Sequence, residues 1–200
     1  PNVALAEAAG VALGSTGAIA TDGRMATDLP GVYAAGDCAE VLHRVTGAST
    51  YIPLGSTANK QGRVAGTNAA GGDAVFHGVV GTMTVRCFDL AVASTGLTAA
   101  RARRLGYDVE EVAIKAKDIS HYFPGAADMH VRLVIETGSN RLLGGQIVGA
   151  NRVAKRIDVL ATALHTGMTV DELGQLDLAY APPVAPAWDP ILVAANVAGK

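Results

Sequence analysis

The regular spacing of apolar residues breaks at one place, and this break divides the chain into two unequal parts. Between Gly71 and Gly81, glycine, aspartate and histidine replace the periodic apolar residues, and a new pattern begins afterwards. A chain of 200 residues is long enough for one good core or two small ones. We therefore predict two domains, residues 1–75 and residues 76–200.

Composition excludes several classes of protein. Half of the residues are hydrophobic and 17% are charged, which is enough apolar surface to offset the entropy of ordering the chain. The net charge is -2 and no basic run stands out, so we expect neither a nucleic acid nor an anionic membrane as a partner. The longest uncharged stretch, residues 45–59, is shorter than the roughly 18 apolar residues of a spanning helix. We expect no transmembrane or signal segment.

The two cysteines, Cys38 and Cys87, form neither a C-x-x-C pair nor a disulfide framework. This usage is typical of the reducing cytoplasm, with both thiols acting as small buried hydrophobes. The chain begins with Pro-Asn and not with Met, so we expect a processed or truncated polypeptide.

Local patterns predict an α/β organisation for the first part. A short apolar run, residues 32–35, indicates a buried strand that ends at Gly36-Asp37. We also predict a short helix within residues 2–13, a strand over residues 18–21, and a helix over residues 58–69 capped by Ser56 or Thr57.

The second part is predicted to be an α+β domain with a mainly antiparallel sheet. Residues 130–136 and 142–148 alternate as a hairpin around a turn at residues 138–140. The other predicted elements are strands over residues 83–93 and 109–116, a short helix capped by Thr98, an amphipathic helix from Val153 to Leu164 closed by Gly167, and a short helix with a Thr169–Glu172 capping box.

One segment, Thr27 to Glu40, has the chemistry of a ligand site. Gly36 follows the predicted buried strand and allows a ligand to approach the backbone closely. Asp37 then lies at the carboxyl end of that strand, where α/β sheets bind ligands, and its carboxylate can accept hydrogen bonds from hydroxyls. The alternative is that Asp37 only caps the next turn.

Complete phosphate and metal motifs are missing from the sequence. No Gly-x-Gly-x-x-Gly follows a strand, and no Gly-x-x-x-x-Gly-Lys-Ser/Thr is present. The five histidines do not have metal-ligand spacing, so we expect no metal site. Any chemistry must therefore come from segments that complete a site built largely elsewhere.

The segment Thr27 to Glu40 resembles the second FAD-binding motif of the pyridine nucleotide-disulfide oxidoreductases, and Tyr51 to Gly66 resembles the next segment in the NADH oxidase and coenzyme A-disulfide reductase branch. The resemblance implies that Asp37 holds the ribityl hydroxyls of FAD. It also implies that the helix start at Leu54, Gly55, Ser56, Thr57 and Ala58 points at the pyrimidine edge of the flavin, where its partial positive charge favours the reduced anion. The alternative is an ordinary surface helix capped by Ser56 and Thr57.

Two later segments, around Tyr122 and from Ala179 to Ala198, are similar to the dimerisation domain of the same branch. There, the resemblance implies, tyrosines from one subunit of a homodimer reach the disulfide site of the other. Tyr180 matches the motif well, whereas Tyr122-Phe123 stands where the family commonly has two tyrosines. The hydroxyl group of a phenol can donate its proton to a thiolate leaving group. The alternative is that both tyrosines only anchor the interface.

The resemblance covers residues 1–198 but only the C-terminal part of a family subunit. It implies the tail of a three-layer FAD-binding domain, followed by an α+β dimerisation domain, in an FAD-dependent enzyme that uses NAD(P)H to reduce a small disulfide or persulfide such as coenzyme A disulfide. We expect the chain to be inactive alone. The alternatives are an NADH oxidase with oxygen as acceptor, or a chain that acts only as a dimerisation module. A ferredoxin- or rubredoxin-reductase-like protein fits the C-terminal segment poorly.

Overall fold

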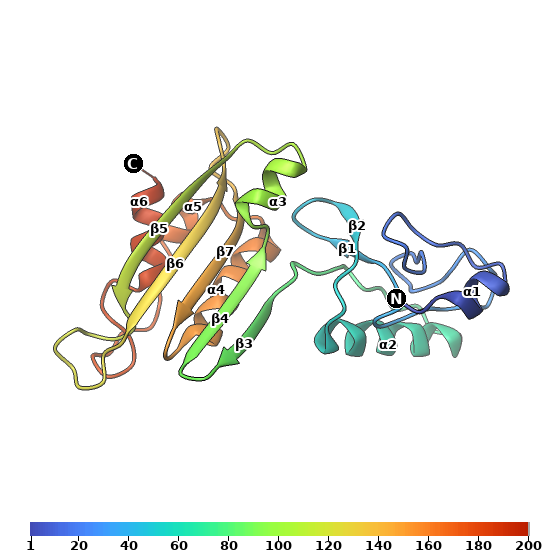
Figure 1. Cartoon of the computed structure of the whole chain (residues 1–200), viewed down its shortest axis with the longest axis horizontal. Coiled ribbons are helices and arrows are strands. Elements are labelled where there is room, and N and C mark those ends of the chain that lie inside the picture. Colours follow the sequence, from blue (N-terminus) through green and yellow to red (C-terminus); the bar gives the residue numbers. More distant parts are fainter. Residues whose placement is uncertain (200) are drawn as a thin grey trace. The chain divides into compact units, whose positions relative to one another are not determined.

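The computed structural model describes residues 1–199 and contains two compact units, Pro1–Val79 and Val80–Lys200. Figure 1 labels the helices and strands of each unit. The predicted domains, residues 1–75 and 76–200, stay a prediction.

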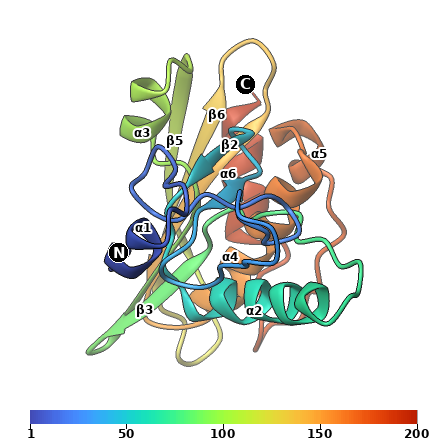
Figure 2. The same ribbon diagram turned by 90° about the vertical axis from the view of Figure 1, so that its right-hand side faces the viewer.

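The first unit has little regular secondary structure. Its elements are the helices α1 (Ala4–Ala8) and α2 (Gly55–Ala69) and the strands β1 (Val41–His43) and β2 (Ala48–Thr50). β1 and β2 form an antiparallel hairpin, and α2 is the long helix of the unit in Figure 2. A small cluster of buried apolar residues, Val11, Ile19, Ala34 and Ala39, forms its core.

The predicted strands over residues 18–21 and 32–35 are wrong. Ile19 forms single bridges with Leu13 and Ala39, and Tyr33 forms one with Ala26. A strand requires consecutive pairs along a neighbour, and the described residues offer each segment only isolated partners. Of the second segment, Ala34 is buried but Val32 is 40% exposed.

Helix α2 begins three residues before the predicted start. Its N-cap is Leu54, and no side chain caps the helix, so the predicted caps Ser56 and Thr57 are wrong. Both residues lie inside the first turn, and Thr57 is turned to the buried face together with Gln61, Val64 and Asn68. That spacing of three to four residues is the period of a helix with one covered face.

The second unit is built on a five-stranded antiparallel sheet, which confirms the predicted α+β class. The strand order is β3-β4-β7-β6-β5, and the strands are β3 (Met83–Cys87), β4 (Leu90–Gly96), β5 (Val109–Lys117), β6 (Asp128–Glu136) and β7 (Leu142–Gly149). The single strand predicted over residues 83–93 is wrong. A tight turn at Phe88, whose φ is +51°, divides it into β3 and β4.

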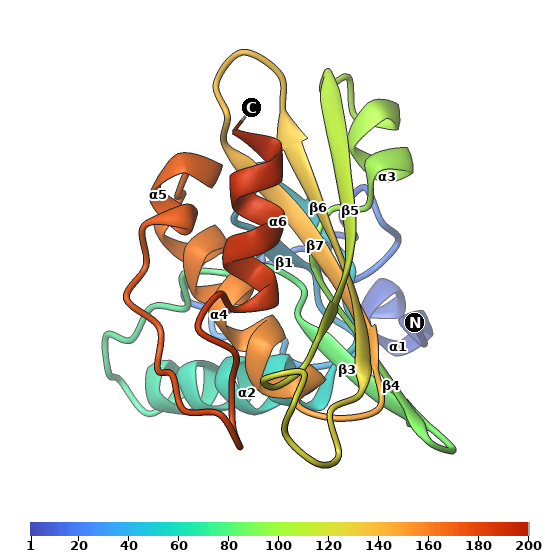
Figure 3. The ribbon, with the colours of Figure 1, turned by 90° about the vertical axis from the view of Figure 1, so that its left-hand side faces the viewer.

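Helices α4 (Val153–Thr166), α5 (Val170–Gly174) and α6 (Pro190–Ala198) cover one face of this sheet, and α3 (Ala99–Arg104) lies on the other side (Figure 3). Leu133 of β6 and Ile157 and Leu160 of α4 are buried in the core of this unit. The Thr98 cap, the closure of α4 by Gly167 and the Thr169–Glu172 capping box are confirmed. Helix α6, which Asp189 caps, had no counterpart among the predicted elements. None of the helices in residues 1–199 is long and apolar enough to span a bilayer.

Candidate functional site

The two segments that resemble FAD-binding motifs meet in the first unit. Gly36 has a φ of +83°, a left-handed conformation that favours glycine. Its backbone N–H donates to Oε1 of Gln61 in α2 at 2.9 Å, and a Cβ atom at Gly36 would lie 3.5 Å from Cβ of Ala58. The Nε2 of Gln61 in turn donates to the Glu40 carbonyl at 3.1 Å. Gln61, which no sequence motif selected, therefore joins the turn to the helix.

The side chain of Asp37 is exposed beside this junction. The Tyr51 hydroxyl donates to the Asp37 carbonyl oxygen at 2.9 Å and so fixes the backbone. Among residues 1–199, nothing donates a hydrogen bond to the Asp37 carboxylate, so it does not cap the turn after it. The carboxylate is available to accept hydrogen bonds from the hydroxyls of a ligand.

The start of α2 presents backbone donors. The first helical hydrogen bond runs from the Ala58 N–H to the Leu54 carbonyl at 2.9 Å, so the N–H groups of Gly55, Ser56 and Thr57 precede it. Gly55 and Ser56 are exposed, and no side chain caps this end. A helix start carries about half a positive charge, which suits an anionic or electron-rich edge. These residues fit the flavin edge that the resemblance implies.

The cysteines differ from expectation. Cys87 is exposed and Cys38 is only partly buried, so the prediction of two buried thiols is wrong. Cys87 lies on β3, an edge strand whose five residues are all exposed. Cys38 contacts the Ala35 carbonyl oxygen through its Sγ atom at 3.5 Å.

The two predicted tyrosines lie on adjoining loops of the second unit. We call residues 118–127 the Tyr122 loop and residues 178–189 the Tyr180 loop; Figure 3 shows them near one end of the sheet. The Ser120 N–H donates to the Pro182 carbonyl oxygen at 3.4 Å, which links the loops. Tyr122 and Tyr180 are 65% and 53% exposed, and neither hydroxyl forms a hydrogen bond within residues 1–199.

Sequence reasoning missed the charged residues behind these loops. Arg152 donates from Nη1 to Asp118 Oδ2 at 2.7 Å, and Arg156 donates from Nε to Asp189 Oδ2 at 2.9 Å. The arginines are four residues apart at the start of α4, and this spacing was the signal in the sequence. Their acidic partners are more than thirty residues away along the chain, so no local pattern could pair them.

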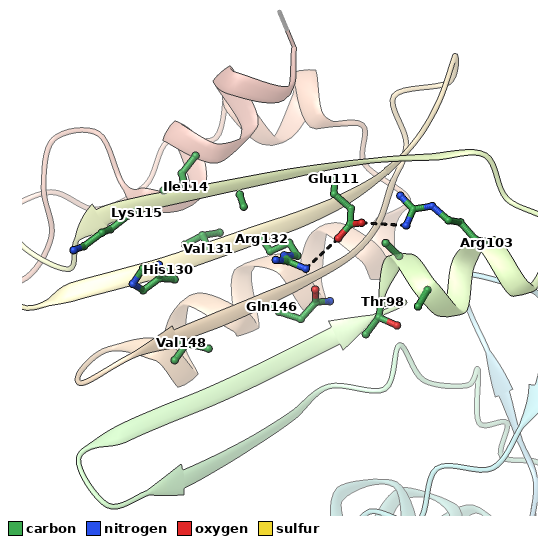
Figure 4. Close-up of a pocket in the computed structure, with 13 residues that line it drawn as sticks. Thr98, Arg103, Glu111, Ile114, Lys115, His130, Val131, Arg132, Gln146 and Val148 are labelled. Carbon is green, nitrogen blue, oxygen red and sulfur yellow. Dashed lines mark hydrogen bonds and ion pairs between the residues drawn. The ribbon is translucent and has the colours of Figure 1, made fainter.

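The sheet face of the second unit also carries a hollow of about 760 Å³, drawn in Figure 4. Glu111 lies between two cations there, 3.2 Å from Nη1 of Arg103 and 3.1 Å from Nη1 of Arg132. Lys115 pairs with Asp128 at 2.9 Å. The hydrogen bond from Lys117 and then that from Lys115 lower the pKa of Asp128 to about 2. Because these cations are paired with carboxylates, the hollow has no strong positive potential that would attract an anion.

Within residues 1–199, no three or more His, Cys, Asp or Glu side chains are arranged to hold a metal ion.

Two models of one family match the chain. Residues 82–190 match the dimerisation domain of the pyridine nucleotide-disulphide oxidoreductases, and residues 1–62 match the pyridine nucleotide-disulphide oxidoreductase model itself. The first match covers more than half of the chain and includes the sheet and the helices α3, α4 and α5 of the second unit. A dimerisation domain implies a dimer.

Individual relatives are named for two kinds of activity. The chain is 45% identical over 197 residues to an NAD(P)H coenzyme A polysulfide/persulfide reductase of Pyrococcus horikoshii, covering 98% of the chain and 44% of the relative. It is 36% identical over 200 residues to an NADH oxidase of Methanocaldococcus jannaschii, covering 100% of the chain and 44% of the relative. The chain thus spans less than half the length of these relatives.

A solved structure agrees with the fold. The NAD-dependent persulfide reductase of A. fulgidus superposes with a TM-score of 0.96 at 49% identity, over 100% of the chain and 37% of that structure. With the family models, this structure identifies the chain as the tail of the pyridine nucleotide-disulphide oxidoreductase domain followed by the dimerisation domain. The chain belongs to the pyridine nucleotide-disulphide oxidoreductase family.

Proposed function

We propose that the chain forms the flavin-edge and dimerisation part of a longer FAD-dependent enzyme, here called the parent enzyme. This enzyme uses NAD(P)H to reduce a disulfide or persulfide such as coenzyme A disulfide. The observation that carries the proposal is that the Tyr122 loop and the Tyr180 loop are hydrogen-bonded to each other while both phenols are exposed. The likeness to a coenzyme A polysulfide/persulfide reductase and to an NAD-dependent persulfide reductase supports the same substrate class.

Residues of the first unit would hold the flavin. Asp37 would accept hydrogen bonds from ribityl hydroxyls, and the tight turn at Gly36 would bring the backbone close to the cofactor. The helix start at residues 54–58 would direct its N–H groups to the pyrimidine edge. When bound, FAD supplies a carrier that takes a hydride from NAD(P)H and passes electrons to sulfur or oxygen. We expect no turnover by the 200-residue chain alone, because it has no complete phosphate cradle.

Residues of the second unit would act on the sulfur substrate of the partner subunit. An exposed phenol can donate its proton to a departing thiolate or orient the sulfur, which a phenylalanine cannot do. Tyr180 is the stronger candidate because its motif matches the family closely. Tyr122 shares the role or packs at the interface, where aromatic residues are common. Either assignment requires a two-fold homodimer.

A second candidate is an NADH oxidase in which oxygen accepts the electrons. The likeness to the Methanocaldococcus jannaschii protein favours it, since that relative covers the whole chain. In that case both tyrosines only pack at the interface. A third candidate, a chain that acts only as a dimerisation module, is consistent with the family match of residues 82–190.

The acceptor can be tested with the parent enzyme by following NADH oxidation. Anaerobic assays contain coenzyme A disulfide or a persulfide, and parallel assays contain oxygen alone. We expect sulfur-dependent turnover that falls about a hundredfold or more in Tyr180→Phe, the usual scale of a lost proton donor. Tyr107→Phe is the matched control, because Tyr107 lies outside both loops. Turnover with oxygen only, indifferent to Tyr180, would establish the oxidase instead.

A further inference from the structure

The Tyr122 loop is closed at its base by one buried aspartate. The Asp118 side chain is 1% exposed. Its N–H donates to the Ala127 carbonyl at 3.0 Å, and its Oδ1 accepts the Ala127 N–H at 2.7 Å. Two hydrogen bonds between the same pair of residues therefore fix both ends of the segment that carries Tyr122. The conformation of this loop depends on where Asp118 is held.

Arg152 joins that base to the Tyr180 loop. Its Nη1 atom donates to Asp118 Oδ2 at 2.7 Å, and its Nη2 atom donates to the Pro183 carbonyl at 3.3 Å. One planar guanidinium thus contacts both loops, a geometry that the single ammonium of lysine cannot reproduce. The bridge lies beside the hydrogen bond from Ser120 to Pro182.

Arg156, one helical turn later, makes a second bridge of the same kind. Its Nη2 atom donates to the Asp118 carbonyl at 2.8 Å, and its Nε atom donates to the Asp189 carboxylate at 2.9 and 3.2 Å. Asp189 also accepts the Ile191 N–H at 3.0 Å and so caps α6, at the end of the Tyr180 loop. Side chains of this second pair are 8% and 10% exposed.

The backbone of Arg152 has an unfavourable conformation, which indicates that its contacts hold it in place. Its φ is +58° and ψ is +14°, in the left-handed region that a non-glycine residue adopts at an energetic cost. Such a conformation persists where surrounding contacts determine it, and here the contacts are those to the two loops. Asn140 in the β6–β7 turn has a similar φ of +56° but contacts neither loop, which makes it a natural control.

We propose that Arg152 and Arg156 are positioning residues that hold the Tyr122 loop and the Tyr180 loop in one fixed relation, so that both phenols reach the same substrate. The proposal rests on the proposed function, which assigns the chemistry to the tyrosines. Arg152 is the better test, because its side chain is 36% exposed, whereas the Arg156 side chain is buried. Removing one partner of a buried ion pair leaves an uncompensated charge and endangers folding.

The structural half of the proposal is tested on the 200-residue chain by amide hydrogen exchange measured with NMR. Arg152→Gly removes the guanidinium but relieves the left-handed backbone, and the Asp118 carboxylate keeps its hydrogen bond from the Ala127 N–H, so the fold should be kept. We expect the Ser120 amide to exchange about tenfold faster in this variant and to an intermediate extent in Arg152→Lys. In Asn140→Gly its exchange should be unchanged. A Ser120 exchange rate in Arg152→Gly equal to that of the unchanged chain would overturn the proposal.

The functional half is tested in the parent enzyme by sulfur-dependent kinetics. Small displacements of reacting groups cost large factors in rate, so we expect kcat to fall about tenfold in Arg152→Gly with the KM for NADH unchanged. Arg152→Lys should recover part of the loss, and Asn140→Gly should match the unchanged enzyme. Unaltered kcat in Arg152→Gly, with Tyr180→Phe impaired, would refute the positioning role and leave the proposed function intact. If Tyr180→Phe is also unimpaired, the proposed function itself fails.

Discussion

The two units of the chain are stabilised by different kinds of contact. The second unit has a five-stranded sheet and a core in which Leu133, Ile157 and Leu160 are at most 1% exposed. The first unit has two three-residue strands and a core cluster of four small or medium apolar residues. Its segments are joined instead by hydrogen bonds between side chains and the backbone, such as those of Gln61 and Asn68. The predicted flavin-binding residues are therefore held mainly by hydrogen bonds between side chains and backbone. The tyrosine loops belong to a unit that is stabilised by its apolar core.

The largest effect should come from the core of the second unit. Leu160→Ala removes a fully buried side chain of α4 and should lower the free energy of unfolding by about 3 kcal/mol. Val11→Ala in the first unit, where the cluster is small, should cost about 1 kcal/mol. Urea titrations followed by circular dichroism measure both. Equal losses would contradict the contrast between the two cores.

Two glycine substitutions should have opposite signs. A Cβ at Gly144 of β7 would clash with the backbone of Leu97, so Gly144→Ala should cost about 2 kcal/mol. A Cβ at Gly62 of α2 would meet nothing within 4 Å, so Gly62→Ala should raise the stability of the first unit by about 0.5 kcal/mol through helix propensity. Thermal unfolding distinguishes them. A destabilised Gly62→Ala chain would mean that this side of α2 is covered.

Loss of the capping box should have a smaller effect. Thr169 accepts the Glu172 N–H, and the Glu172 carboxylate accepts the Thr169 N–H at 2.8 Å. Thr169→Ala should therefore lower the free energy of unfolding by about 1 kcal/mol. The fluorescence of Trp188, the only tryptophan, reports on the second unit alone. An unchanged urea midpoint would show that packing, not the cap, holds α5.

The smallest effect concerns pH. Lys117 and then Lys115 lower the pKa of Asp128 from 3.8 to about 2. Because the folded pKa is below the unfolded one, the Asp128 carboxylate stabilises the fold above about pH 4, and this contribution is lost as the pH falls through about 2. The stability difference between Asp128→Asn and the unchanged chain should shrink over that window in urea titrations. Asp177→Asn, which removes no ion pair within residues 1–199, is the control. A difference as large at about pH 2 as above about pH 4 would contradict the assignment.

Local patterns predicted the second unit better than the first. The β6–β7 hairpin, α4 and the capping box depend on neighbours in sequence, and the structure has all three. Residues 18–21 and 32–35 were wrongly predicted as strands, because apolar content alone does not supply a pairing partner. The turn at Phe88 has no glycine or proline to mark it.

The sequence predicted the motif residues of the candidate site but not the residues that hold them in place. Sequence motifs selected Gly36, Asp37 and the start of α2, and the structure brings Gly36 against Ala58. Gln61 was missed, as were the arginines behind the tyrosine loops. Their contacts join residues 21 to 38 positions apart, and such pairings come from the fold.

The most direct test of the central claim mixes two strongly impaired forms of the parent enzyme. The claim is that Asp37 of one subunit works with Tyr180 of its partner. Subunits carrying Asp37→Ala and subunits carrying Tyr180→Phe are each assayed alone and then after unfolding and refolding together. Each mixed dimer would contain one intact site, so sulfur-dependent turnover should return to about a quarter of the unmutated level. No recovery, with mixed dimers demonstrated by mass, would show that the two residues do not act across the interface.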